Sequence, residues 1–138
     1  MHILGGTVAT NASGAKGFKY GSTRKHILGL YIILSTGQLL DIQRGNCFVK
    51  NRLYIPIKNK PLFCALPGYR LPKVKNSVDY YIFSGSDLID LFIGCEGILG
   101  MISKIKVILC ELPEQEFNGV VFFKTKMQAL EFVFNLKN

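Results

Sequence analysis

Two glycine-rich stretches are the parts of this 138-residue sequence whose residue types best suit ligand chemistry. The first runs from Gly5 to Gly14 (GGTVATNASG) and the second from Gly94 to Gly100 (GCEGILG), where Glu96 is the one acid. Because glycine forfeits side-chain packing and adds backbone entropy, its repetition favours turns in which the main chain closely approaches something else. We interpret both stretches as offering backbone N–H groups and one carboxylate to a ligand. The alternative is a plain glycine-rich corner between a helix and a strand.

The first stretch matches neither the G-x-G-x-x-G turn of a Rossmann fold nor the Walker pattern that ends in Gly-Lys-Ser/Thr. A helical turn from Thr7 to Ala12 would direct its free N–H groups toward Gly5 and Gly6, which would suit an anion. Positive charge follows nearby, at Lys16, Lys19, Arg24 and Lys25.

Metal and thiol chemistry are less favoured. The four cysteines (Cys47, Cys64, Cys95 and Cys110) form no Cys-x-x-Cys pair, and the only histidines are His2 and His26. A zinc site is therefore not expected, and neither is a structural disulfide. We predict buried free thiols, and we predict a solvated or hydrogen-bonded surface position for His26.

The net charge of +8 is unevenly distributed. Residues 1–78 hold 12 Lys or Arg and one acid, whereas residues 79–138 hold 5 Lys or Arg and 8 acids. The basic half suits nucleic acid, an acidic ligand such as a pyrophosphate, or solvent. Because no zinc finger, RNP-like aromatic pair or GXXG loop accompanies it, we do not expect nucleic-acid binding.

The length corresponds to about one ordinary domain with a single core. The longest apolar runs, such as residues 27–34, are shorter than the roughly 18 residues that a membrane span needs. Gly5 and Gly6 follow the first four residues directly and leave no room for a signal peptide. The sequence therefore predicts a cytoplasmic protein with no membrane span.

The elements that would position the glycine stretches can be read from the apolar pattern. Residues 27–34 and 39–42 predict a β-hairpin with Gly37 in its turn. Prolines at 56, 61, 67 and 72 predict that residues 43–78 form an extended surface excursion, because proline blocks regular helix and central strand.

The second glycine stretch is expected between a helix and a strand. Residues 87–93 predict a buried helix with Ser86 as its N-cap, ended by Gly94. Residues 101–109 alternate as a strand with one face in the core, the inward positions including Met101, Ile105 and Val107.

A composition break after Pro113 predicts a boundary. Residues 120–124 predict a strand, and Thr125 and Gln128 have the spacing of a capping box that opens a helix to about Leu136. A single strand and helix cannot bury both faces, so we expect the remainder of this unit to come from elsewhere.

Three segments together resemble one family, the FAD-linked oxidases and dehydrogenases of the vanillyl-alcohol-oxidase type, near the glycolate oxidase flavin subunit and D-lactate dehydrogenase branch. These segments are residues 5–14 with Lys19-Tyr20-Gly21, residues 69–76 (YRLPKVKN), and residues 87–100 (DLIDLFIGCEGILG). In this order, with a hairpin between the first two and a strand after the last, they carry the resemblance over roughly residues 4–112.

The resemblance implies an α+β fold: residues 1–112 would form the second lobe of a two-lobed FAD-binding domain, with an antiparallel or mixed sheet and flanking helices. Residues 113–138 would begin the substrate domain, and the first lobe and most of the substrate domain would be absent. It also implies the residues that line the FAD cleft: Gly5, Gly6, Thr10, Asn11, Ala12, Ser13, Glu96, Gly97, Ile98, Leu99, Gly100, Met101 and Ile102.

The sequence departs from the family pattern at several positions. Cys95 stands where the family usually has Ser, Ile98 where it has Thr, and Val78-Asp79 where an Ala-Gly pair is common. Each lost hydroxyl could remove a hydrogen bond to FAD worth about 0.5–1.5 kcal/mol.

The function implied is oxidation of a 2-hydroxy acid, of the glycolate or D-lactate type, by hydride transfer to the flavin. No titratable residue matches a catalytic base. Because the first lobe and most of the substrate domain would be absent, we expect weak FAD affinity and no turnover from these 138 residues alone. The alternative is a non-catalytic remnant or interaction module that pairs with a partner chain carrying the missing lobe.

Overall fold

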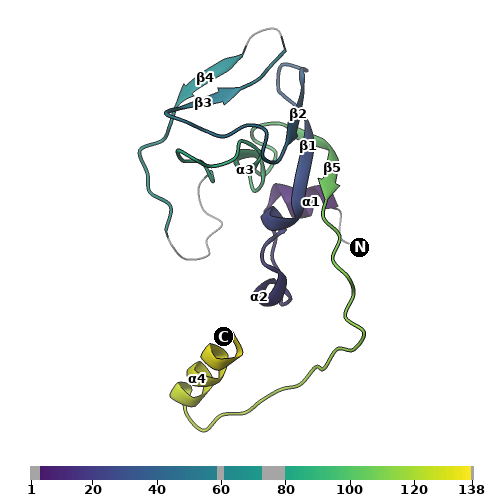
Figure 1. Ribbon diagram of the computed structural model, residues 1–138, viewed down its shortest axis with the longest axis vertical. Coiled ribbons are helices and arrows are strands. Elements are labelled where there is room, and N and C mark those ends of the chain that lie inside the picture. The colour runs from purple at the N-terminus through teal and green to yellow at the C-terminus, as the bar shows by residue number, and fades with distance from the viewer. Residues whose placement is uncertain (1–3, 59–60, 73–79, 138) are drawn as a thin grey trace.

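The computed structural model describes residues 4–58, 61–72 and 80–137. Its helices and antiparallel sheets form an α+β fold (Figure 1). In chain order the elements are α1 (Leu4–Ala9), α2 (Gly17–Tyr20), the 3-10 turn η1 (Thr23–His26), β1 (Ile27–Ile33), β2 (Leu39–Gln43), β3 (Arg52–Ile55), β4 (Leu62–Ala65), α3 (Ile89–Phe92), β5 (Met101–Val107) and α4 (Lys126–Lys137).

The central sheet has the order β2-β1-β5, and both pairs are antiparallel. The predicted β-hairpin is confirmed: β1 pairs with β2 from Gly29↔Gln43 to Ile33↔Leu39, and Gly37 adopts a φ of 78° in the turn. Because β1 lies in the middle, its Leu30 and Ile32 side chains are fully buried. This strand pairs with β5, which directly follows the second glycine stretch.

Strand β5 confirms the predicted strand but ends earlier, at Val107, and its alternation differs from the prediction. Tyr31 pairs with Lys104 whereas Ile32 pairs with Ile102, so Ser103 is an extra residue at a β-bulge. The bulge reverses the facing only of the residues that precede it, because Ile105 and Val107 after it are half-buried as predicted. As a result Ile102 is half-buried, and Met101, expected to point inward, is 63% exposed.

Residues 43–78 were predicted to form an extended surface excursion without regular helix or central strand, but a regular ladder lies in their middle. Strands β3 and β4 form an antiparallel pair from Arg52↔Ala65 to Ile55↔Leu62. Pro56 directly follows β3 and Pro61 directly precedes β4, so neither proline removes a hydrogen bond from the ladder.

Helix α3 is buried, as predicted, but it is shorter than the expected 87–93 and has a different cap. Asp87 Oδ1 accepts a hydrogen bond from the Ile89 N–H (3.3 Å), whereas Ser86 Oγ bonds the backbone of Phe83. Gly94 adopts a φ of 89° where the chain leaves the helix, as expected of a glycine that ends one. Phe92 is 1% exposed, so the helix packs into the core beneath the central sheet.

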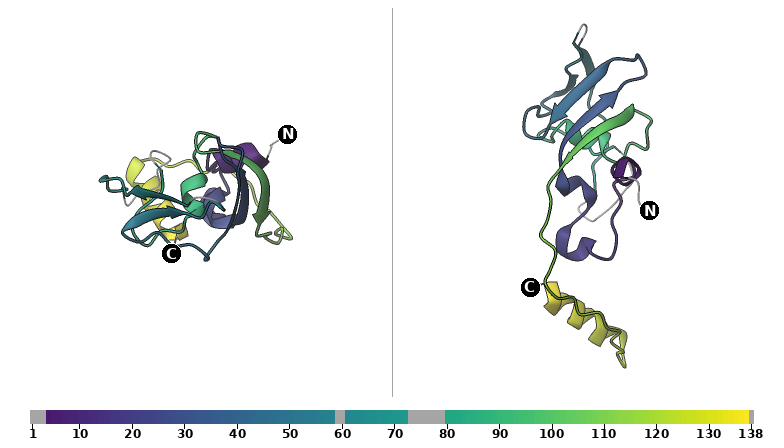
Figure 2. Two further views of the ribbon diagram at one scale, coloured as in Figure 1. Left: turned by 90° about the horizontal axis from the view of Figure 1, so that it is seen from above. Right: turned by 90° about the vertical axis from the view of Figure 1, so that its right-hand side faces the viewer.

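The C-terminal segment lies apart from the sheets in Figure 1 and in the right-hand view of Figure 2. Helix α4 is confirmed, and Thr125 Oγ1 accepts a hydrogen bond from the Gln128 N–H at 3.3 Å, which is half of the predicted capping box. The predicted strand over residues 120–124 was wrong: the segment is extended and unpaired, because no sheet edge lies beside it, and Phe122 is 91% exposed.

The four cysteines are free thiols. Cys95 is buried as predicted, Cys47 and Cys64 are half-buried, and Cys110 is exposed, so the prediction of burial was wrong for Cys110. The departures at Val78 and Asp79, and the last four residues of the 69–76 motif, lie outside the described residues. Within the described residues, every helix is too short or too polar to cross a membrane.

Candidate functional site

The two glycine stretches meet through backbone hydrogen bonds, although residues 15–93 separate them in the sequence. The Gly94 N–H donates to the Val8 carbonyl (3.0 Å) and the Glu96 N–H donates to the Ala9 carbonyl (2.9 Å). A Cβ atom on Gly94 would lie 3.2 Å from the Cβ of Asn11, so the two turns are in van der Waals contact. The structure therefore brings together the segments that sequence analysis paired.

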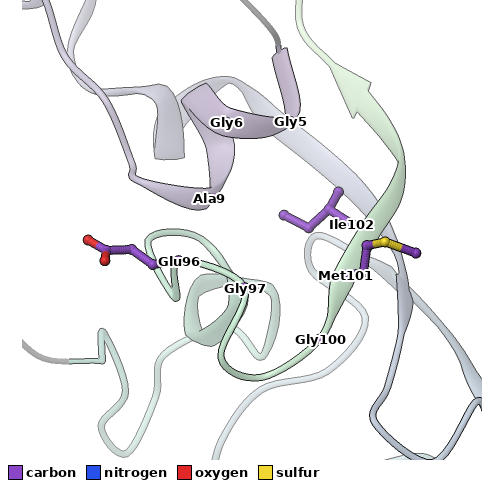
Figure 3. Close-up of a pocket in the computed structure, with 8 residues that line it drawn as sticks. All are labelled: Gly5, Gly6, Ala9, Glu96, Gly97, Gly100, Met101 and Ile102. Carbon is purple, nitrogen blue, oxygen red and sulfur yellow. The ribbon is translucent and has the colours of Figure 1, made fainter.

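A cleft of about 410 Å³ lies where they meet, and we call it the glycine cleft. It is lined by Gly5, Gly6, Ala9, Glu96, Gly97, Gly100, Met101 and Ile102. Figure 3 shows the Ile102 side chain directed into the space between α1 and the second turn, whereas the Met101 and Glu96 side chains extend away from it. The volume is within the range of about 300–1,000 Å³ that is usual for small-molecule sites.

Gly5 and Gly6 lie inside α1, and not before a helix as predicted. The helix spans Leu4–Ala9, and the Thr10 N–H donates to the Gly6 carbonyl at 3.0 Å. A Cβ atom at either glycine would meet nothing within 4 Å, and neither has a positive φ. Since glycine in a helix costs about 0.5–1 kcal/mol relative to alanine, no contact or turn within the described chain accounts for these two residues. They do fit a ligand that approaches the helix backbone closely.

The second turn needs its glycines for different reasons. Gly97 has a φ of 83°, and Gly100 has a φ of 154° with a would-be Cβ 2.7 Å from Ile32 Cγ2 and 2.9 Å from the Ile33 carbonyl oxygen. Glu96 has a φ of 52°, although glutamate rarely adopts a left-handed conformation. Asn11 in the first stretch is likewise left-handed, with a φ of 46°. Strained backbone therefore occurs in both stretches where they approach each other.

Six of the predicted ligand residues do not line the glycine cleft: Thr10, Asn11, Ala12, Ser13, Ile98 and Leu99. Thr10 Oγ1 donates to the Gly6 carbonyl (2.9 Å), and Asn11 Oδ1 accepts from the Arg24 N–H (3.1 Å). Ile98 is 75% exposed beside the cleft residue Gly97. Ala9, by contrast, lines the cleft and was missed, because a lone alanine inside a small-residue stretch carries no signal of its own.

The charges near the glycine cleft differ from those expected. Glu96 is the charged residue among its lining residues. Lys16 forms an ion pair with Glu116, which raises the pKa of the lysine, and Lys19 lies over the Tyr20 ring at 5.2 Å. The predicted positive charge therefore does not face the cleft through these described residues.

Arg24 belongs to a half-buried charge network that sequence analysis missed. Asp90 lies between two arginines, with its Oδ1 3.2 Å from Arg24 Nη1 and 3.0 Å from Arg44 Nη2. The Arg24 guanidinium also lies 4.3 Å from the Tyr81 ring centroid. Burial lowers the pKa of Arg24, partly offset by the Asp90 carboxylate. The one available signal was Asp90, an acid inside an otherwise apolar helix.

Other places in the described chain are weaker candidates. A larger hollow of about 570 Å³ runs along α4, but a single helix face lines it. Its lining residues are Leu130, Glu131, Phe134 and Asn135, and no second element converges on them. The described residues contain no cluster of three or more His, Cys, Asp or Glu side chains suited to a metal ion. His26 is hydrogen-bonded as predicted, through Nε2 to the Tyr20 carbonyl at 3.0 Å.

Comparison with known proteins bears on the cofactor. Residues 2–43 match a family described as an FAD binding domain. These residues include α1, the rest of the first glycine stretch and the β1–β2 hairpin. Residues 2–43 thus resemble part of an FAD binding domain, and the cofactor that this match indicates is FAD.

Individual relatives agree with this family. The chain is 32% identical over 110 residues to D-2-hydroxyglutarate dehydrogenase, mitochondrial, of Bos taurus, an alignment that covers 80% of the chain and 14% of the relative. It is 28% identical over 114 residues to glycolate oxidase subunit GlcD of Bacillus subtilis, covering 83% and 17%. It is 28% identical over 128 residues to a probable D-lactate dehydrogenase, mitochondrial, of Danio rerio, covering 93% and 20%. The chain thus spans between 14% and 20% of the length of these relatives.

Proposed function

We propose that the glycine cleft binds part of FAD in an oxidoreductase that oxidises a 2-hydroxy acid of the glycolate or D-lactate type. The observation that carries the proposal is the pair Gly5 and Gly6: they lie in a helix, line the cleft and have open space in front of them. When bound, the flavin would supply the hydride acceptor, and the protein would position it.

The residues of this chain suggest how the cofactor would be held. Gly5, Gly6 and Ala9 form one wall, and Gly97, Gly100 and Ile102 belong to the turn and strand opposite. The Glu96 side chain extends away from the cleft, but its negative charge lies at the cleft's edge and disfavours a phosphate there. We therefore propose that this cleft holds a part of FAD other than its pyrophosphate.

The domain organisation is part of the proposal. Residues 1–112 would be the second lobe of a two-lobed FAD-binding domain, and residues 113–138 would begin the substrate domain. The remaining length of the relatives would supply the other lobe and the catalytic residues. The cytoplasmic location stays a prediction.

The test is FAD binding by the 138-residue chain, measured by equilibrium dialysis. We expect weak, saturable binding. The substitution Ala9→Leu should lower the FAD affinity at least tenfold, because the larger side chain would protrude from the wall into the cleft. The matched control is Ala65→Leu, at an exposed position of β4 outside the cleft, which should bind like wild type. Equal binding by the two variants would contradict the proposed site.

A second candidate function is an interaction module that pairs with a partner chain. Its support is the exposure of large apolar side chains after β5, for example 96% for Phe117, 87% for Leu112 and 67% for Phe134. Large apolar side chains gathered in one part of a chain suit burial against a partner. Co-purification with a chain that carries the missing lobe would support a split enzyme, whereas a stable monomer that ignores FAD would support a remnant.

A further inference from the structure

Arg24 is hydrogen-bonded both to the first glycine stretch and to the residues that directly precede the second. Its backbone N–H donates to Asn11 Oδ1 at 3.1 Å, on the side of the first stretch. Its guanidinium donates through Nη2 to the Ile93 carbonyl at 2.7 Å and through Nη1 to the Asp90 carbonyl, on the side of the second. Thr23, the preceding residue, also contacts the first stretch: its Oγ1 donates a hydrogen bond to the Ala12 carbonyl at 2.6 Å.

The contact with Ile93 has a direct geometric consequence. The Ile93 carbonyl and the Gly94 N–H belong to the same planar peptide group. The Arg24 guanidinium donates to the carbonyl oxygen of this peptide group, and the Gly94 N–H of the same group donates to the Val8 carbonyl at 3.0 Å. With both ends held, the peptide plane at the start of the second turn cannot rotate without breaking one of the two bonds.

The orientation of this peptide decides where the cleft residues lie. Gly94 has a φ of 89°, and two residues later the Glu96 N–H donates to the Ala9 carbonyl at 2.9 Å. Glu96 and Gly97 follow directly and line the glycine cleft opposite Gly5 and Gly6. A rotation at the 93–94 peptide would therefore move one wall of the cleft relative to the other.

Arg24 is itself held rigidly. Its side chain is 15% exposed, and that of its partner Asp90 is 10% exposed. On the far side of Asp90, Arg44 donates to the Ile27 carbonyl from Nε (2.7 Å) and to the Arg24 carbonyl from Nη2 (3.0 Å). Only a guanidinium has the planar fork of donors that can reach a carboxylate and two carbonyls together.

From these contacts we propose that Arg24 is a positioning residue for the FAD cleft: it sets the register between the two glycine stretches by fixing the Ile93–Gly94 peptide. The proposal rests on the proposed function of the cleft. Arg24 itself does not line the cleft, so it acts through the two turns and not by touching the cofactor.

The experiment compares Arg24→Lys with Arg44→Lys in the complete chain. Both variants keep a positive charge beside Asp90, so the ion pair is matched between them. Lysine at position 24 cannot bond the Asp90 and Ile93 carbonyls together, whereas lysine at position 44 leaves those bonds intact. Urea unfolding measures the global stability of each variant, and amide hydrogen exchange measures protection at Gly94 and Glu96.

We expect Arg24→Lys to lower protection at these two amides at least tenfold beyond its effect on global stability, and Arg44→Lys to lower it only in proportion to global stability. FAD titration should show at least a tenfold higher Kd for Arg24→Lys than for Arg44→Lys. Equal local protection in the two variants, or equal FAD affinity with unequal protection, would overturn the positioning role.

The two proposals fail in different ways. If the wild-type chain does not bind FAD, the proposed function fails for this chain, and the exchange measurement still decides whether Arg24 sets the register. If FAD binds and both variants behave alike, the cleft stands and the role of Arg24 is refuted. As a further variant, Asn11→Ala removes the side chain that bonds the Arg24 N–H, and it should lower the same local protection in the same direction.

Discussion

The substitution Gly6→Ala should have opposite effects on the stability of the fold and on the affinity of the cleft for FAD. Gly6 lies within α1, has no positive φ, and a Cβ atom there would meet nothing within 4 Å. Alanine is therefore sterically free in the chain alone, and helix propensity predicts that it stabilises the folded state by about 0.5–1 kcal/mol.

For FAD the same methyl group is an obstacle, because Gly6 lines the glycine cleft. Inserting a methyl into a well-packed contact costs about 1–3 kcal/mol, which corresponds to a Kd raised about 5- to 150-fold. Urea unfolding gives the free energy of unfolding, and a fluorescence titration of FAD gives the Kd. The prediction is that stability rises while affinity falls.

The matched control is Gly68→Ala. Gly68 also has no positive φ and no atom within 4 Å of a would-be Cβ, but it lies outside the cleft. Its substitution should leave the Kd unchanged. If Gly6→Ala and Gly68→Ala bind FAD equally well, the argument that the helix glycines exist for close approach of a ligand is wrong.

Three other outcomes follow from the packing. Gly100→Ala should destabilise the fold by about 1–3 kcal/mol in urea unfolding, since its Cβ would lie 2.7 Å from Ile32 Cγ2; an unchanged stability would refute this close contact. Asp90→Ala should cost about 3–5 kcal/mol, because it leaves two guanidinium groups without their carboxylate, and a loss below 1 kcal/mol would show that the network is dispensable. An aromatic disulfide reagent should label the exposed Cys110 quickly and the 2% exposed Cys95 only on unfolding; equal labelling rates would contradict these burials.

The sequence predicted best those features that depend on local pattern. The hairpin of β1 and β2, the buried α3 and the start of α4 each follow from apolar periodicity and a cap or turn residue near in sequence. The pairing of the two glycine stretches could be anticipated because their composition is unusual. The prediction that Gly5 and Gly6 precede a helix was wrong, since the helix begins at Leu4 and includes them.

Features that depend on distant partners could not be predicted in the same way. Leu53 and Ile55 alternate with exposed residues in β3, as a strand requires. The nearby prolines led to the prediction of no regular strand there, although Pro56 and Pro61 lie outside the ladder. The unpaired segment at 120–124 has strand-like residues but no neighbouring edge, so propensity alone was misleading. Arg24 was predicted only as positive charge near the first glycine stretch, yet its partner is Asp90, 66 residues further on.

Whether both glycine stretches form one FAD cleft is tested most directly by titrating the ¹⁵N-labelled chain with FAD. The backbone amide signals of the glycines are monitored during the titration. We expect saturable shifts at Gly5 and Gly6 from the first stretch together with Gly97 and Gly100 from the second, with one shared Kd. Shifts confined to one stretch, or shifts centred on α4 with these four amides unmoved, would contradict a single cleft built from both.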